Sequence, residues 1–175
     1  FFNSAGILRG QKRDLYEGGV RVPFIIKYKY VIQSGVATDQ IYGFWDVMPT
    51  FRDMLNLNKL KDVDGKSFWP VISGKGKAKP HKYLYWEFYE ADGKQGVLYQ
   101  EWKGIRLNTN NLPQSRFELY NLKEDPSEKN NLATANPKMV KKILKIMEKE
   151  HQPFPLTSLF KKDESAQRDV QAVIK

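Results

Sequence analysis

The chain has 175 residues and a formal net charge of +9, from 29 Lys and Arg against 20 Asp and Glu. A hydrophobic content of 41% with 13% aromatic residues is typical of a folded domain and excludes an intrinsically disordered chain. The absence of Cys and the presence of only two His exclude disulfides, a thiolate zinc site, a cysteine nucleophile and a His-rich metal centre within these residues.

The positive charge is spread through loops and along one helix, and it leaves two interpretations open. One is an ordinary soluble basic surface, and the other is a surface that binds a polyanionic glycan. No apolar run has the length of a membrane span and no signal peptide is visible, so we expect no membrane partner. The chain starts at Phe1 without an initiator Met, and we expect it to be part of a longer protein.

A glycine-rich basic loop opens the chain. Arg9 directly precedes Gly10, and Lys12 and Arg13 lie between Gly10 and the Gly18-Gly19 pair. Glycines let a backbone adopt positive φ or approach a ligand closely, and the cations make this loop a candidate anion site. We expect Glu17 to pair with Arg21 or another neighbour. The β-branched and aromatic residues from Val20 to Tyr30 predict a buried strand after the loop.

A predicted amphipathic helix spans residues 43–57. Its apolar residues recur at helical spacing, which predicts one face in the core: Phe44, Val47, Met48, Phe51 and Leu55. Asp46 is the expected N-cap, with Pro49 in the first turn. A metal-ligand role for Asp46 is the less favoured alternative.

A flexible basic loop at residues 74–80 predicts a boundary, after which strand patterns dominate. The side chains of residues 82–90 alternate between apolar and polar, and Asp92-Gly93 is a hairpin signal. Residues 95–99, 102–108 and 116–122 predict three more strands, so we expect a small antiparallel sheet.

Asn136 and Pro137 predict the start of a helix, as N-cap and first helical residue. Val140, Ile143, Leu144 and Met147 form its predicted buried stripe. We expect three parts in all: the end of a larger domain at 1–75, an antiparallel sheet with a helix at 76–152, and an extended tail at 153–175.

Two motifs resemble the type I sulfatases, the arylsulfatase and N-acetylhexosamine sulfatase family of the alkaline-phosphatase-like superfamily. The first is Leu8-Arg9-Gly10-x-Lys12 followed by Tyr16-Glu17-Gly18-Gly19-x-Arg21-x-Pro23. The second is Leu119-Tyr120-Asn121-Leu122-x-x-Asp125-Pro126-x-Glu128-x-x-Asn131-Leu132, in which Asn121 stands where the family usually has Asp. The resemblance implies that Lys12 binds the sulfate group as a catalytic-site residue. We expect the second motif to be structural, with Glu128 and Asn131 satisfying backbone groups of its own turn.

The resemblance covers the chain from Gly6 to about Met147 and implies the C-terminal portion of an α/β enzyme, α+β within this fragment. It comprises the end of the large sheet and a subdomain of about four antiparallel strands packed on a helix. Sulfatases hydrolyse sulfate esters with a formylglycine nucleophile and calcium, or magnesium in some descriptions. The formylglycine motif is missing from these residues. We therefore expect nucleophile and metal ligands outside the chain, no cofactor bound by this fragment, and no activity of the fragment alone.

The resemblance also suggests residues that contact a sulfated glycan or aryl sulfate substrate. The candidates are Arg9, His81, Lys94 and Gln95, with Trp86 and Glu87 as further rim residues. Arg9 has an alternative role as a partner of Glu17, and the remaining candidates have the alternative of ordinary strand and hairpin residues. A periplasmic or secreted location is compatible with a cysteine-free chain.

Two other functions stay open. A phosphonate or phosphate monoester hydrolase of the same superfamily shares the Leu-Tyr-x-Leu-x-x-Asp-Pro ending. A non-enzymatic basic module that binds glycans through its aromatic hairpins predicts salt-sensitive binding of polyanions. We expect no nucleic-acid partner.

Overall fold

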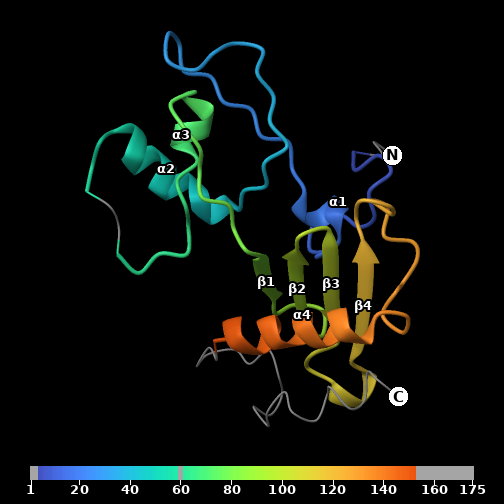
Figure 1. The fold of residues 1–175 in the computed structure, drawn as a ribbon. Coiled ribbons are helices and arrows are strands. Elements are labelled where there is room, and N and C mark those ends of the chain that lie inside the picture. The colour runs from blue at the N-terminus through green and yellow to red at the C-terminus, as the bar shows by residue number, and fades with distance from the viewer. Residues whose placement is uncertain (1–3, 59–60, 153–175) are drawn as a thin grey trace. The chain divides into compact units, whose positions relative to one another are not determined.

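The computed structural model describes residues 4–58 and 61–152, and these residues form two compact units (Figure 1). Unit 1 contains the residues up to Val22 and those from Tyr83 onward, whereas unit 2 runs from Pro23 to Lys82. The expected tail at 153–175 lies outside the described residues, and the expected division after residue 75 stays a prediction. No helix among the described residues is long and apolar enough to span a membrane.

Unit 1 is built on a four-stranded antiparallel sheet in the order β1-β2-β3-β4. Its strands are β1 Leu84–Phe88, β2 Lys94–Tyr99, β3 Trp102–Leu107 and β4 Arg116–Asn121. Each strand pairs with the next along the chain, as short connections favour. The 3-10 helix η2, Leu112–Gln114, lies between β3 and β4. All four predicted strands and the antiparallel sheet are confirmed.

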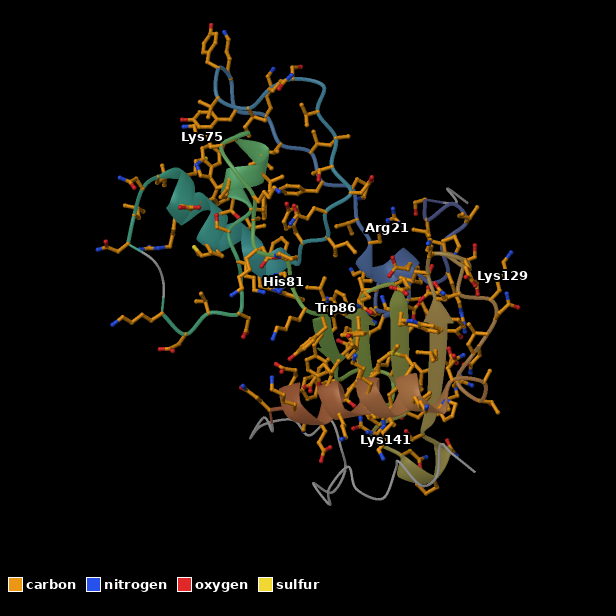
Figure 2. The ribbon with its side chains drawn as sticks, viewed as in Figure 1. Arg21, Lys75, His81, Trp86, Lys129 and Lys141 are labelled. Carbon is orange, nitrogen blue, oxygen red and sulfur yellow. The ribbon has the colours of Figure 1, made fainter. Side chains whose placement is uncertain are left out.

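Helix α4, Pro137–Glu150, covers one face of this sheet (Figure 1). The predicted stripe is confirmed, because its four side chains are buried against Val97, Phe117 and Leu119 of the strands. Each fully buried side chain of this size stabilises the fold by about 1.5–3 kcal/mol. Lys141 lies on the exposed side of the helix (Figure 2). The helix begins where predicted, but the Asn136 amide donates to the carbonyl of Leu132 and does not cap the helix.

The opposite face of the sheet receives the N-terminal loop and the short helix α1, Glu17–Val20. Leu15 and Tyr16 pack there with Ile105, Leu107 and Tyr120. Residues separated by about a hundred positions thus form one core, which brings the basic loop to the C-terminal sheet.

Unit 2 contains η1 Phe44–Asp46, α2 Val47–Met54 and α3 Trp69–Ile72. Phe68 is its most buried apolar side chain, and the rings of Tyr42 and Phe24 lie 4.4 Å and 5.7 Å from it between centroids. Thr50 accepts a hydrogen bond from the N–H of Phe68 and donates one to the carbonyl of Asp46, which fixes α2 to this small core.

Two predictions for this region are wrong. The strand predicted from Val20 to Tyr30 does not form: Val20 ends helix α1 and residues 21–30 are in no strand. A strand needs a paired neighbour, and the described part of unit 2 contains no strand. The predicted helix exists, but its stripe is not in a core: Phe44, Met48, Phe51 and Leu55 are 90%, 61%, 47% and 60% exposed. The described part of unit 2 places no layer over this side of α2.

Candidate functional site

Lys12 lies in a turn of the N-terminal loop, exposed to solvent. The turn is closed by a hydrogen bond of 2.9 Å from the N–H of Asp14 to the carbonyl of Gln11. Within the described part of the chain, the Lys12 ammonium has no hydrogen bond or ion pair. A cation that no protein group neutralises is available to an external anion.

The same loop is fixed at its base by Arg9. Its backbone carbonyl accepts from the N–H of Gly18 at 2.7 Å, which closes the loop. Its guanidinium donates to the hydroxyls of Tyr120 and Tyr16 at 2.8 Å and 3.0 Å, and to the carbonyl of Glu128 at 3.0 Å. The Glu118 carboxylate lies 3.5 Å from the guanidinium. The anticipated pairing of Arg9 with Glu17 is wrong, since Arg9 pairs with Glu118 from β4.

Both tyrosines of this cluster donate to one carboxylate. The hydroxyls of Tyr16 and Tyr120 lie 2.6 Å and 2.7 Å from Oε2 of Glu118. Burial is the main cause that raises the pKa of both tyrosines, and the hydrogen bond to Glu118 is the second. The pKa of Tyr16 lies above its ordinary value, and that of Tyr120 is raised to about 12. The two phenols therefore remain neutral donors at physiological pH, and they hold the Glu118 charge that pairs with Arg9.

A second buried cluster lies under α1. The Lys103 ammonium, on β3 and 0% exposed, contacts Oε1 of Glu17 at 2.8 Å. The N–H of Glu17 donates to Oε2 of Glu128 at 2.7 Å. The expected pair of Glu17 with Arg21 is wrong, because Lys103 is its partner. Glu128 also departs from its expected role, since it satisfies a backbone group of α1 and not of its own turn.

The rest of the second motif is structural in the expected way. Asp125 accepts from the N–H groups of Lys129 and Asn130, both at 2.8 Å. Asn131 accepts from the N–H groups of Leu119 and Ala133 at 3.0 Å. Local acceptors of this kind shape the turn that delivers Glu128 to the base of the loop.

Glu128 makes the stability of this cluster dependent on pH. Burial raises the pKa of its carboxyl to about 7 from an ordinary 4.5, against the opposing hydrogen bond from Glu17 and the charge of Lys103. The folded protein therefore binds more protons than the unfolded chain between these values, so stability decreases as pH rises through this window. We expect a loss of at most about 3 kcal/mol between pH 4.5 and 8.

The test compares the complete protein with its Glu128→Gln variant by urea unfolding across this range. Gln cannot ionise, so the variant is expected to lack this decrease while keeping the contact with Glu17. An equal slope in both proteins would show that Glu128 does not titrate in this way.

The other predicted substrate residues have partners within the fold. Lys94 donates to the carbonyl of Arg13 at 3.0 Å and lies 3.2 Å from Oδ1 of Asp14. Gln95 is 1% exposed on the α4 face and donates to the Tyr85 hydroxyl at 2.8 Å. A glycan contact by Gln95 stays a prediction to which this burial lends no support.

The rim residues on β1 divide between the two faces of the sheet. Glu87 accepts hydrogen bonds from the hydroxyls of Tyr85 and Tyr89 and lies 2.7 Å from Nδ1 of His151. Trp86, labelled in Figure 2, faces the other side, where its ring lies 5.0 Å from the Lys103 ammonium. These contacts make Glu87 and Trp86 part of the internal structure of unit 1.

His81 belongs to unit 2, where it contacts a buried acid. Nε2 of His81 lies 2.9 Å from both carboxylate oxygens of Asp46. The N–H groups of Gly43 and Lys66 also donate to Asp46, at 2.8 Å and 2.7 Å. Asp46 thus ties three segments of unit 2 together. It stands at the expected N-cap position of α2, but its side chain makes no cap hydrogen bond there and instead accepts from the N–H of Gly43 at the start of η1. Among the described residues, no group of three or more His, Cys, Asp and Glu could hold a metal ion.

The buried residues that hold the loop were not predicted from the sequence. Tyr16, Lys103 and Glu118 are buried, and Lys103 and Glu118 are charged residues within predicted strands. A charge in a strand whose two faces are both covered signals a buried partner. The sequence therefore indicates that Lys103 and Glu118 have buried partners, but it does not identify those partners.

The chain matches a family model described as the C-terminal domain of N-sulphoglucosamine sulphohydrolase over residues 10–153. It is 29% identical to an N-acetylglucosamine-6-O-sulfatase of Bacteroides thetaiotaomicron, covering 82% of this chain and 27% of that protein. It is 30% identical to an ulvan-active sulfatase of Formosa agariphila, covering 68% of this chain and 30% of that protein. The chain therefore spans less than a third of the length of these relatives.

A solved structure confirms the fold. A Bacteroides thetaiotaomicron protein, described in connection with the metabolism of multiple glycosaminoglycans, superposes with a TM-score of 0.68 at 23% identity. The match covers 82% of this chain and 32% of that one. The antiparallel sheet with its helix is thus a fold that this chain shares with that protein. By the family match across residues 10–153, the chain belongs to the sulfatases of the alkaline-phosphatase-like superfamily, as a C-terminal portion.

Proposed function

We propose that this chain is part of an enzyme that hydrolyses sulfate esters on a glycan, and that Lys12 binds the sulfate group. The observation that carries the proposal is the exposed Lys12 ammonium, without a protein partner among the described residues, on a loop fixed by buried contacts. The names of two relatives, an N-acetylglucosamine-6-O-sulfatase and an ulvan-active sulfatase, support a glycan as the substrate. The net charge of +9 favours polyanionic substrates.

The role of Lys12 is electrostatic. A fixed ammonium beside the sulfate stabilises the negative charge that develops on the ester oxygen when the bond breaks. The contacts at the base of the loop hold this ammonium in place before the substrate arrives, so that little reorganisation is needed during the reaction.

The remaining chemistry is assigned to residues outside this chain. Formylglycine would supply the nucleophile, and its Cys/Ser-x-Pro-x-Arg motif does not occur in the sequence. Calcium or magnesium would act as its metal, and no group of three or more His, Cys, Asp and Glu among the described residues could hold it. The 175-residue chain by itself is accordingly proposed to be inactive. A periplasmic or secreted enzyme suits a cysteine-free chain that acts on extracellular glycans.

The test is Lys12→Ala in the complete enzyme. We expect kcat/KM to fall by about 100- to 1,000-fold on an aryl sulfate and on 6-O-sulfated N-acetylglucosamine, as for removal of one oxyanion-stabilising group. Lys141→Ala, on the exposed side of α4, is the matched control and should leave kcat/KM unchanged.

Three outcomes would contradict the proposal. An unchanged kcat/KM for Lys12→Ala would remove Lys12 from the site. Faster hydrolysis of phosphate or phosphonate monoesters than of sulfate esters would assign the enzyme to the other reaction class. Hydrolysis by the 175-residue chain alone would place a nucleophile within these residues.

A further inference from the structure

The turn that carries Lys12 has an unfavourable backbone conformation at its next residue. Arg13 has φ of +79°, and the hydrogen bond from Asp14 to Gln11 spans the turn. A positive φ at the third position is the type II arrangement, which normally requires Gly. A residue with a side chain in this region costs on the order of 1–3 kcal/mol, so surrounding contacts must hold it.

Asp14 supplies the first of these contacts. Its Oδ2 accepts from the N–H of Gln11 at 3.0 Å, so the carboxylate bridges the two ends of the turn. Its other oxygen, Oδ1, lies 3.2 Å from the ammonium of Lys94. The single carboxylate thus links the Lys12 turn to the C-terminal sheet.

Lys94 supplies the second contact. It is the first residue of β2 and pairs with Phe88 on β1 and Leu107 on β3. Its ammonium also donates to the carbonyl of Arg13 at 3.0 Å and lies 5.6 Å from the centre of the Phe88 ring. Its side chain is only 14% exposed. Lys94 therefore contacts both residues that follow Lys12 and offers little surface to a substrate.

We propose that Lys94 is a positioning residue for Lys12, acting through Asp14 and the Arg13 carbonyl, in place of the sugar contact expected from the sequence. The proposal rests on the function proposed for Lys12. Loss of the Lys94 contacts lets the turn relax away from the positive φ at Arg13 and moves the Lys12 ammonium from the sulfate. A displacement of about 1 Å at a reacting centre costs up to about 100-fold in rate.

The experiment is a double-mutant cycle in the complete enzyme, measured as kcat/KM on an aryl sulfate. Lys94→Met and Asp14→Ala are each expected to lower kcat/KM by about ten-fold. Added to Lys12→Ala, neither should lower it further, because a positioning residue has no effect once its target is gone. Lys94→Arg keeps the donors and should restore most of the activity.

Lys142→Met is the matched control, because this lysine also donates to a sheet residue, the Tyr99 hydroxyl at 2.6 Å, but on the α4 side. It should leave kcat/KM unchanged. Thermal unfolding of every variant separates a local effect from loss of the fold. If Lys94→Met does not fold, Asp14→Ala tests the contact between Lys94 and the Lys12 turn.

The outcomes distinguish this proposal from the one it rests on. If Lys12→Ala leaves kcat/KM unchanged, the proposed function of Lys12 fails. Suppose that Lys12→Ala lowers kcat/KM strongly. If Lys94→Met then lowers kcat/KM further in the Lys12→Ala background, or if Asp14→Ala leaves kcat/KM unchanged, Lys94 acts directly on the substrate. Either of the latter results overturns the positioning role and leaves Lys12 in the site.

Discussion

Replacing Lys103 with Met is expected to lower the free energy of unfolding by about 3–5 kcal/mol. The Lys103 ammonium is fully buried and lies 2.8 Å from Oε1 of Glu17, whose side chain is 9% exposed. Its removal leaves the Glu17 carboxylate without its buried counter-charge, and an unpaired buried charge is strongly destabilising. Urea unfolding of the complete protein at fixed pH measures the change.

A second substitution tests the reason for this loss. Lys103→Met combined with Glu17→Gln removes both charges, and it should recover much of the stability because no buried charge is left unpaired. Lys142→Met is the control for loss of an exposed lysine and should change the free energy of unfolding by less than about 0.5 kcal/mol. A loss below 1 kcal/mol for Lys103→Met would mean that Glu17 finds another partner or water.

Replacing Gly19 with Ala is expected to be equally severe. A Cβ atom on Gly19 would overlap the carbonyl oxygen of Asp14 and lie 2.7 Å from that of Gln11. Both carbonyls belong to the turn that carries Lys12, and backbone atoms cannot move aside as a flexible side chain can. We expect a loss of unfolding free energy on the order of 4 kcal/mol. We also expect kcat/KM to fall at least as far as in Lys12→Ala.

The control for this substitution is Gly76→Ala in unit 2. Among the described residues, a Cβ atom there meets the Pro70 Cβ alone, at 3.6 Å, which is an ordinary contact. Its effect on both kcat/KM and unfolding should be small. If Gly19→Ala keeps wild-type activity, the close approach between α1 and the turn does not determine where Lys12 lies.

The sheet and α4 could be predicted because their signals are local. Alternation on β1 and the four apolar positions of α4 each depend on residues within one segment. The strand expected over 20–30 failed for the opposite reason. Its β-branched and aromatic residues fit a strand, but pairing requires a neighbour that the described residues do not supply. The prediction that the apolar stripe of α2 is buried is wrong for the same reason. Periodicity shows which residues share a helix face, but it does not show what covers that face.

The candidate site was predictable only in part. The motif resemblance indicated Lys12, and the structure shows it exposed. The supporting contacts are long-range: Arg9 reaches Tyr120 across 111 residues, and Glu17 reaches Lys103 across 86. No pattern within a short segment shows that a charge on β3 meets a glutamate in the first turn of α1. Lys94 illustrates the same limit, because its position in a hairpin suggested a solvent-exposed contact whereas its side chain turns to the loop.

The division of unit 1 into two stretches has a consequence for the order of folding. The strands and α4 are contiguous, so their contacts close short loops, whereas the N-terminal loop reaches them across all of unit 2. Closing a longer loop costs more entropy, and distant contacts form later than local ones. During synthesis, the turn with Lys12 leaves the ribosome before the strands on which it packs. Its contact with Lys94, and that of Arg9 with Glu128, form only after these later residues have emerged. A nascent chain arrested before that point therefore carries Lys12 without the contacts that fix its turn.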